Sequence, residues 1–220
     1  MDSHQSIIER IKEQGLLPLY YNADKDVCIR VAHALYNAGV RIIEFTNRGK
    51  MALENFKALK AERDSLMKDL MLGIGTIGNA QDANAFMDAG ADFLVSPFFD
   101  AGVADAAYIR KVLWIPGCMT PTEIHHAKNA GCNFIKLFPG NVLQPSFVQA
   151  VKELFPGIDL MPTGGVEIDK ENLSAWFDAG VCAVGMGSKL VSKKLMETKD
   201  YETIEKTTRK VLKRIAAIKK

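Results

Sequence analysis

The sequence predicts an α/β protein of the (β/α)8 TIM-barrel class with a short N-terminal helix. Eight short apolar segments alternate with helix-like segments along the 220 residues, which is the pattern of a parallel barrel. Four helix-like segments end alike, with Asp or Asn followed by Ala-Gly, at 37–39, 88–90, 129–131 and 178–180. A glycine there supplies the left-handed conformation that a short return to a strand requires. A doubly wound open sheet is the alternative.

The predicted elements follow one another without a linker or a low-complexity stretch, so we expect one domain over 1–220. An amphipathic helix at 6–14, stopped by Gly15, is expected to cover one end of the barrel or to act as a packing arm. The predicted strands are 16–21, 41–47, 71–76, 93–97, 114–118, 134–140, 159–163 and 182–187. The predicted helices are 24–37, 50–62, 79–88, 104–111, 121–130, 145–154, 169–178 and one at the C-terminus.

Composition excludes some classes of partner. Lys and Arg total 28 against 26 acidic residues, and a net charge of +2 gives no global attraction to nucleic acid or membrane. The basic stretch 206–220 carries apolar residues at helical spacing and is interpreted as a solvated helix face. Four scattered cysteines show no metal-ligand spacing and are expected to be reduced. Neither a signal peptide nor a membrane-length apolar run is found, so we expect a cytoplasmic protein.

One lysine stands within an apolar run. Lys136 is the only lysine inside a predicted strand, and the run around it is short, apolar and bounded by Gly and Pro, as in a strand buried on both faces. Burial removes hydration from an ammonium group and lowers its pKa, which makes the free amine available as a Schiff-base nucleophile. The alternative is a structural pair with a buried carboxylate.

A carboxylate is predicted inside the barrel at the end of the second strand. Alternation places Ile43 and Phe45 on the helix-facing side and Glu44 on the interior side. An interior carboxylate is costly unless it is paired or takes part in chemistry, so Glu44 is a candidate general acid–base, a role compatible with pairing to Lys136. Arg48 follows the same strand and could bind a substrate carboxylate bidentately, or be a surface arginine.

Glycine-rich loops follow the last two strands. Gly164 and Gly165 come after the seventh strand, and Gly187 and Ser188 come after the eighth. Backbone N–H groups in such loops can surround an anion, and barrels commonly hold phosphate at these two positions. We predict phosphate contacts at these four residues, with ordinary turns as the alternative.

Seven motifs in order resemble those of the 2-keto-3-deoxy-6-phosphogluconate (KDPG) / 4-hydroxy-2-oxoglutarate (KHG) aldolase family. They are Glu44-x-x-x-Arg48, Gly73-x-Gly75-Thr76, Val95-Ser96-Pro97, Pro116-Gly117-x-x-Thr120-Pro121-Thr122-Glu123, Lys136-x-Phe138-Pro139, Pro162-Thr163-Gly164-Gly165 and a terminal Gly-x-Gly-Ser. The resemblance runs from about residue 16 to residue 190. It implies a class I aldolase that releases pyruvate, forms a homotrimer and needs neither metal nor cofactor.

The resemblance also implies roles for individual residues. Lys136 would form the Schiff base and Glu44 would move protons. The substrate-binding residues would be Arg48 and Thr76 for the keto-acid carboxylate, Pro97 and Phe138 around the imine, and Thr163 toward the aldehyde half.

The substrate stays open at this point. The loop Gly185-Met186-Gly187-Ser188 resembles the sister phosphogalactonate aldolases more closely, whereas Arg48 favours the phosphogluconate enzymes. The rival functions are a phosphosugar isomerase or decarboxylase, and a non-catalytic phosphometabolite binder.

Overall fold

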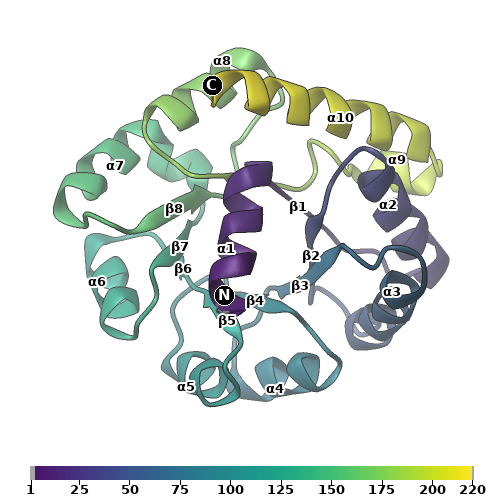
Figure 1. The fold of residues 1–220 in the computed structure, drawn as a ribbon, viewed down its shortest axis with the longest axis horizontal. Helices are drawn as coiled ribbons and strands as arrows, with labels where there is room; N and C mark the ends of the chain where they lie inside the picture. Colours follow the sequence, from purple (N-terminus) through teal and green to yellow (C-terminus); the bar gives the residue numbers. More distant parts are fainter. Residues whose placement is uncertain (1–2, 220) are drawn as a thin grey trace.

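Short parallel strands form a closed barrel inside a ring of helices, as Figure 1 shows in a view down the barrel. The computed structural model describes residues 3–219. The strands are β1 (Leu16–Tyr20), β2 (Ile42–Thr46), β3 (Met71–Gly75), β4 (Phe93–Val95), β5 (Leu113–Ile115), β6 (Gly117–Cys118), β7 (Phe134–Leu137), β8 (Asp159–Pro162) and β9 (Val184–Met186). The helices are α1 (Ser3–Gln14), α2 (Lys25–Asn37), α3 (Ala52–Leu66), α4 (Ala80–Asp88), α5 (Ala101–Arg110), α6 (Pro121–Asn129), α7 (Gly140–Leu154), α8 (Lys170–Asp178), α9 (Lys193–Glu197) and α10 (Tyr201–Ile218).

Two hydrogen-bonded sheets join to close the barrel. One has the order β5-β4-β3-β2-β1-β9 and the other the order β6-β7-β8. Pro116 separates β5 from β6 because it has no N–H to donate, yet its carbonyl accepts from the Lys136 N–H at 2.9 Å. On the other side, a parallel bridge between Thr163 and Gly185 connects β8 with β9. The fold prediction is therefore confirmed and the open sheet is excluded.

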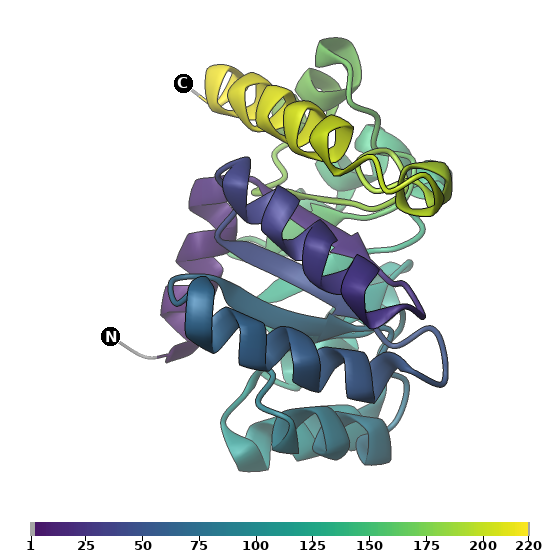
Figure 2. The same ribbon diagram turned by 90° about the vertical axis from the view of Figure 1, so that its right-hand side faces the viewer.

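Side chains alternate between two apolar cores, as period-2 strands require. Ile43 and Phe45 pack in the core between strands and helices, whereas Ile42 packs in the barrel interior with Phe93 and Phe134. Figure 2 shows α2 and α3 lying along the outside of the strands. The even positions of β2 therefore face inward, which places the Glu44 side chain in the barrel.

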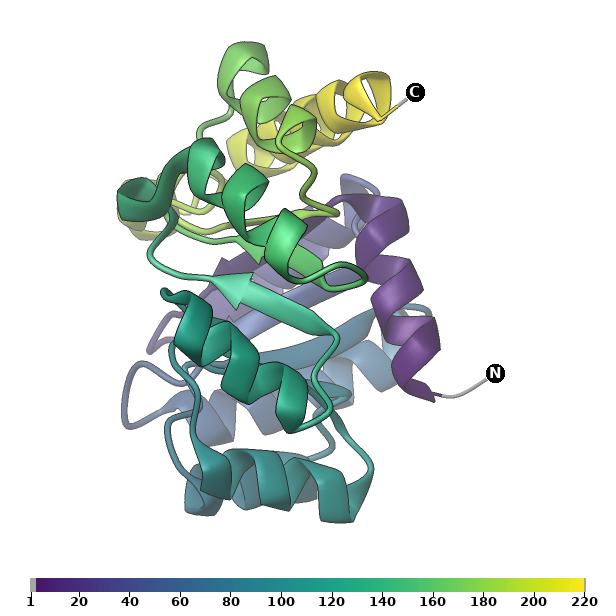
Figure 3. The ribbon, with the colours of Figure 1, turned by 90° about the vertical axis from the view of Figure 1, so that its left-hand side faces the viewer.

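Helix α1 closes the N-terminal end of the barrel. Ile7 and Ile11 belong to the interior core, and Lys12 pairs with Asp159 at the start of β8, with 2.9 Å between Nζ and Oδ2. Figures 1 and 3 show this helix crossing one end of the barrel. Of the two roles expected for the N-terminal helix, covering one end of the barrel is confirmed.

The predicted helix stops adopt the expected geometry. The four glycines of the Ala-Gly stops have positive φ: Gly39 (108°), Gly90 (87°), Gly131 (84°) and Gly180 (98°). At the opposite end, Asp24, Asn79, Asp100 and Asp169 cap α2, α4, α5 and α8 by accepting hydrogen bonds from backbone N–H groups. These caps lie where the strands lead into the helices.

Some boundaries differ from the predictions. The first helix starts at Ser3, α5 starts at Ala101, and the short helix α9 was missed. The predicted start at Pro145 survives as a kink inside α7, because Gln144 has φ 62° and ψ 163°. A residue before proline is pushed out of the helical region. Within the described chain, none of the helices has the length and apolarity needed to span a bilayer.

Candidate active site

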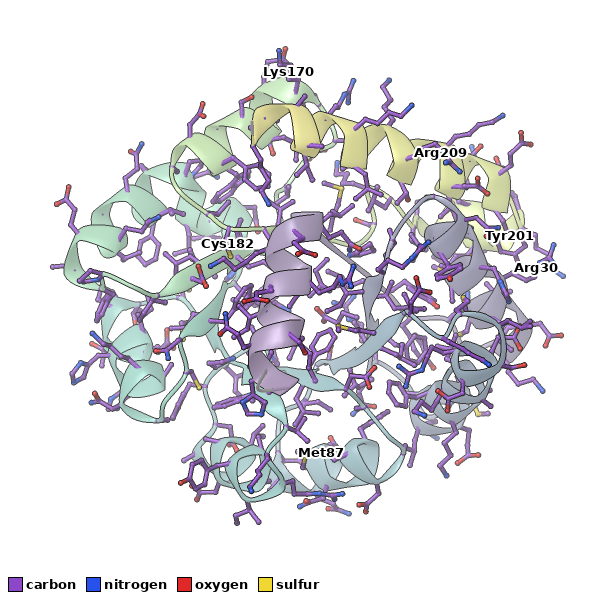
Figure 4. The ribbon with its side chains drawn as sticks, in the orientation of Figure 1. Arg30, Met87, Lys170, Cys182, Tyr201 and Arg209 are labelled. Carbon is purple, nitrogen blue, oxygen red and sulfur yellow. The ribbon has the colours of Figure 1, made fainter. Side chains whose placement is uncertain are left out.

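Lys136 lies inside the barrel, on the middle of β7. Its strand neighbours Ile135 and Leu137 face the helices, so alternation turns the lysine inward, where it is only 4% exposed. Other cations such as Lys170 and Arg209 lie on the outer ring of helices (Figure 4) and are exposed. The buried position predicted for Lys136 is observed.

Glu44 faces Lys136 from β2. Its side chain is fully buried, and its Oε1 lies 3.9 Å from Lys136 Nζ. This distance is too long for a hydrogen bond, and neither carboxylate oxygen has a hydrogen-bond partner within residues 3–219. The two groups therefore attract each other without being locked together, which leaves both able to engage a third group.

Burial acts more strongly on this pair than the mutual attraction does. Burial lowers the pKa of Lys136 and outweighs the opposing effect of Glu44, while the Arg48 cation lowers that pKa further. Burial also raises the pKa of Glu44 and outweighs the opposing effects of Lys136 and Arg48. Both shifts make the neutral form of each group easier to reach than it is in water, and a neutral amine is the form of Lys136 that acts as a nucleophile.

The predicted substrate-binding residues lie just beyond the C-terminal ends of the strands. The Phe138 ring centroid lies 5.1 Å from Lys136 Nζ. Arg48 is exposed at the rim, and its charge acts on both Glu44 and Lys136. Thr76 and Pro97 are half-buried at the ends of β3 and β4.

Two backbone contacts hold these rim segments together. The Asn47 N–H donates to the Gly75 carbonyl at 2.8 Å, which joins the segments that carry Arg48 and Thr76. A methyl group at Gly117 would lie 2.8 Å from the Phe98 nitrogen and closer still to the Pro97 carbonyl. A glycine at position 117 therefore lets β6 approach the segment that carries Pro97.

The glycine loops lie next to each other. Gly164 and Gly165 have φ values of 86° and 72°, a conformation that suits glycine. Thr163, 5% exposed, has an Oγ1 without a hydrogen-bond partner among the described residues. It forms a bridge with Gly185, so the two loops begin side by side. Gly187 is half-buried and Ser188 is exposed.

Sequence reasoning missed two residues at these loops. Lys189 pairs with Glu167 at 2.9 Å, which ties the loop after β9 to the loop after β8. Asn141 packs against Gly165, where a methyl group would lie 2.5 Å from the asparagine Cβ. Lys189 directly follows Ser188, so its position was a usable signal, whereas nothing in the sequence pointed to Asn141.

No metal centre emerges from the side chains of residues 3–219, because no three His, Cys, Asp or Glu residues gather closely enough to hold an ion. The four cysteines are unpaired with one another.

Comparison with known proteins identifies the family of this chain. The family model described as "KDPG and KHG aldolase" matches residues 7–207. The 2-dehydro-3-deoxy-phosphogluconate aldolase of Haemophilus influenzae is 26% identical over 211 residues, covering 94% of this chain and 96% of that protein. The corresponding Pseudomonas aeruginosa enzyme is 30% identical, covering 93% and 91%. The 2-dehydro-3-deoxy-6-phosphogalactonate aldolase of Escherichia coli is 27% identical, covering 80% and 83%.

Solved structures extend the agreement to the fold. A 4-hydroxy-2-oxoglutarate / 2-dehydro-3-deoxyphosphogluconate aldolase aligns with a TM-score of 0.82 and 32% identity, covering 98% of this chain and 99% of that one. The KDPG aldolase of Legionella pneumophila, captured with pyruvate as a covalent carbinolamine, aligns with a TM-score of 0.83 at 23% identity, covering 90% and 93%. The barrel, the buried lysine–glutamate pair and the family match lead to one conclusion: the chain belongs to the KDPG/KHG family of class I aldolases.

Proposed function

We propose that the protein cleaves KDPG to pyruvate and glyceraldehyde 3-phosphate, 4-hydroxy-2-oxoglutarate to pyruvate and glyoxylate, or both. The observation that carries this proposal is the fully buried Glu44 placed 3.9 Å from a buried Lys136. A 2-keto-4-hydroxy acid requires an amine to activate C2 and a proton carrier near C3 and C4, and this pair supplies both.

The reaction begins at Lys136. Its neutral amine attacks the C2 carbonyl to give a carbinolamine, and loss of water leaves an iminium ion. The C4 hydroxyl then gives up its proton and the C3–C4 bond breaks. Its electron pair moves into the iminium to form an enamine, and the aldehyde departs. Protonation of the enamine carbon and hydrolysis of the iminium release pyruvate and regenerate the amine.

Glu44 carries the protons in this scheme. It protonates the departing carbinolamine hydroxyl, accepts the C4 hydroxyl proton through a water, and returns a proton to the enamine. Burial raises the pKa of Glu44, so this carboxyl holds a proton more readily than a carboxyl in water does.

The rim residues orient the substrate. Arg48 and Thr76 bind the keto-acid carboxylate, Pro97 and Phe138 shape the space around the imine, and Thr163 contacts the aldehyde half. Holding the substrate at both ends keeps the C3–C4 bond aligned with the imine. We assign the phosphate to the loops of Gly164, Gly165, Gly187 and Ser188, supported by the bridge that places these loops together.

The second candidate substrate is 2-keto-3-deoxy-6-phosphogalactonate, which would make the protein a phosphogalactonate aldolase. It is favoured by the similarity to the Escherichia coli phosphogalactonate enzyme and by the Gly-Met-Gly-Ser loop. Comparing kcat/KM for the two phosphorylated epimers, by the rate of pyruvate release, decides between them.

Trapping with borohydride tests the central assignment. Incubation with pyruvate and borohydride should add one reduced pyruvyl group, and peptide mass mapping should find it on Lys136. The variant Lys136→Met should take up no label, whereas Lys189→Ala, which removes a rim lysine outside the barrel interior, should be labelled like the wild type. Label on a different lysine in the wild type would overturn the assignment.

A further inference from the structure

Strand β3 presents two glycines to the interior of the barrel. Leu72 and Ile74 pack in the core between strands and helices, so Gly73 and Gly75 occupy the inward positions of this strand. Glycine in the middle of a strand has no side chain to pack and marks close approach of another group. Each of these two glycines admits a different neighbour.

Gly75 occupies the place beside the Glu44 side chain. A methyl group at Gly75 would lie 2.8 Å from Glu44 Cγ, 2.5 Å from Cδ and closer still to Oε1. Real Cβ atoms do not approach other heavy atoms this closely. Gly75 is not among the residues with positive φ, and it pairs with Thr46 in an ordinary parallel ladder. The glycine is therefore required by space and not by backbone conformation.

The carboxylate depends on this space because hydrogen bonds do not hold it. Buried carboxylates are normally fixed by hydrogen bonds, but neither Glu44 oxygen has such a partner among the described residues. Its ion-pair partner, Lys136 Nζ, is 3.9 Å away. The shape of the surrounding wall must then decide where the carboxylate lies, and Gly75 is part of that wall.

We propose that Gly75 is a positioning residue for the reaction: its missing side chain lets the Glu44 carboxyl lie beside Lys136 and the bound keto acid. This inference rests on the proposed aldolase function and assigns to Gly75 a role that acts only through Glu44. Alanine at this position would push the carboxyl away from the proton-transfer geometry.

A double-mutant cycle tests the inference. Gly75→Ala should lower kcat roughly 100-fold, the size of effect that a displacement of about 1 Å can cause, with little change in KM. In a Glu44→Ala background the same substitution should change the residual kcat by no more than about twofold, because the group it displaces is gone. The thermal midpoint should fall with Gly75→Ala alone and recover in the double variant.

The neighbouring glycine supplies a matched control. A methyl group at Gly73 would lie 2.5 Å from Phe93 Cε1 and closer to other atoms of that ring. Gly73→Ala adds the same methyl to the same strand face but meets a different residue. Its effect on the thermal midpoint should therefore be the same in the Glu44 and Glu44→Ala backgrounds.

The results of these experiments distinguish a role of Gly75 that acts through Glu44 from a general effect on folding. Wild-type kcat in Gly75→Ala, or equal losses of rate and thermal midpoint in both backgrounds, would overturn the inference. If Gly75→Ala does not fold, a folded Gly75→Ala/Glu44→Ala double variant supports the inference, and an unfolded one overturns it. If the wild type cleaves no keto-hydroxy acid, the proposed function fails, and the thermal cycle alone still decides whether Gly75 accommodates Glu44.

Discussion

At the scale of single residues, the site depends on the balance between burial and charge attraction. A hydrogen-bonded salt bridge would favour the ionised forms of Lys136 and Glu44, but this ion pair is 3.9 Å apart and has no hydrogen bond. Burial instead lowers the pKa of Lys136 and raises the pKa of Glu44. Desolvation of a charge is the larger cost in such a place, so the pair is suited to exchanging protons and poorly suited to stabilising the fold.

The charges around Lys136 predict opposite pH shifts for two variants. Glu44 raises the pKa of Lys136, whereas Arg48 lowers it. Removing the carboxylate with Glu44→Gln should move the pH at which pyruvate trapping becomes fast to a lower value, because the amine loses its proton earlier. Arg48→Ala should move that pH to a higher value. The measurement is the rate of borohydride trapping across pH.

The same variants should also differ in turnover. Glu44→Gln should lower kcat by roughly 10²–10⁴-fold, the range for a positioned acid–base, while Arg48→Ala should chiefly raise KM for the keto acid. Shifts of the trapping profile in the same direction for both variants would contradict the electrostatic account. Unchanged turnover in Glu44→Gln would assign that residue a structural role.

The sequence was enough to predict which side chains of the site are buried in the barrel. A single lysine in an apolar strand and a carboxylate at an inward position of β2 predicted the burial of Lys136 and Glu44, because period 2 fixes which side of a strand each residue faces. The 3.9 Å distance and the space left by Gly75 were not accessible, because both depend on how neighbouring strands stagger in the closed barrel.

At the scale of elements, the loops after β8 and β9 are connected to each other at two points. The bridge between Thr163 and Gly185 aligns their starts, and the Lys189–Glu167 ion pair joins their outer parts. Gly165 packs directly on Asn141 backbone atoms, where a methyl group would lie 2.6 Å from Cα. Any side chain at Gly165, such as that of Asp, would therefore disturb the loop itself. A test of phosphate binding is for this reason placed at Ser188.

Ser188→Ala should selectively weaken the use of phosphorylated substrate. One hydrogen bond to a charged group is worth about 1.5–3 kcal/mol, so kcat/KM for the phosphosugar acid should fall roughly 10- to 150-fold, while that for 4-hydroxy-2-oxoglutarate should change little. Ser65→Ala, at an exposed serine on α3, serves as the control and should change neither. Equal losses for both substrates in Ser188→Ala would make these loops ordinary turns.

The helix boundaries show where local signals sufficed. The Asp/Asn-Ala-Gly stops at Gly39, Gly90, Gly131 and Gly180 all adopt the left-handed conformation that they predicted, because this preference is a property of glycine itself. The short helix α9 was missed since its five residues carry too few turns for periodicity to register.

At the scale of the whole molecule, the barrel separates a closed end from an open one. Helix α1 fills the N-terminal end with Ile7 and Ile11, whereas the loops at the other end carry Arg48, Thr76 and Ser188. The alternation of strands and helices predicted this architecture from the sequence. The sequence pattern did not predict how copies of the chain assemble. Apolar residues that are exposed in the single chain, such as Tyr108 and Ile109, do not stand out from buried ones by their spacing.

We propose a homotrimer, as the family resemblance implies, and the exposed apolar residues of α5 offer a surface for contact between copies. Tyr108 is 83% exposed and Ile109 is 77% exposed in the single chain, and burying such side chains between copies is favourable. Light scattering should give three times the chain mass of 24.2 kDa. Ile109→Lys should reduce this mass, whereas Leu66→Lys, at a similarly exposed residue of α3, should leave it unchanged. A wild-type protein with the mass of one chain would overturn the trimer.

The closed floor formed by α1 has a consequence for the order of events. A site that is covered at one end must take up substrates and release products through the other end. In the proposed reaction the pyruvate half is bonded to Lys136 in the interior, and the aldehyde half lies toward the loops at the C-terminal end of the barrel. The aldehyde must therefore leave first and pyruvate last, and in the direction of synthesis pyruvate enters before its partner. Since Ile7 and Ile11 cover the far end of the barrel, we expect the proposed reaction to release its two products in this order.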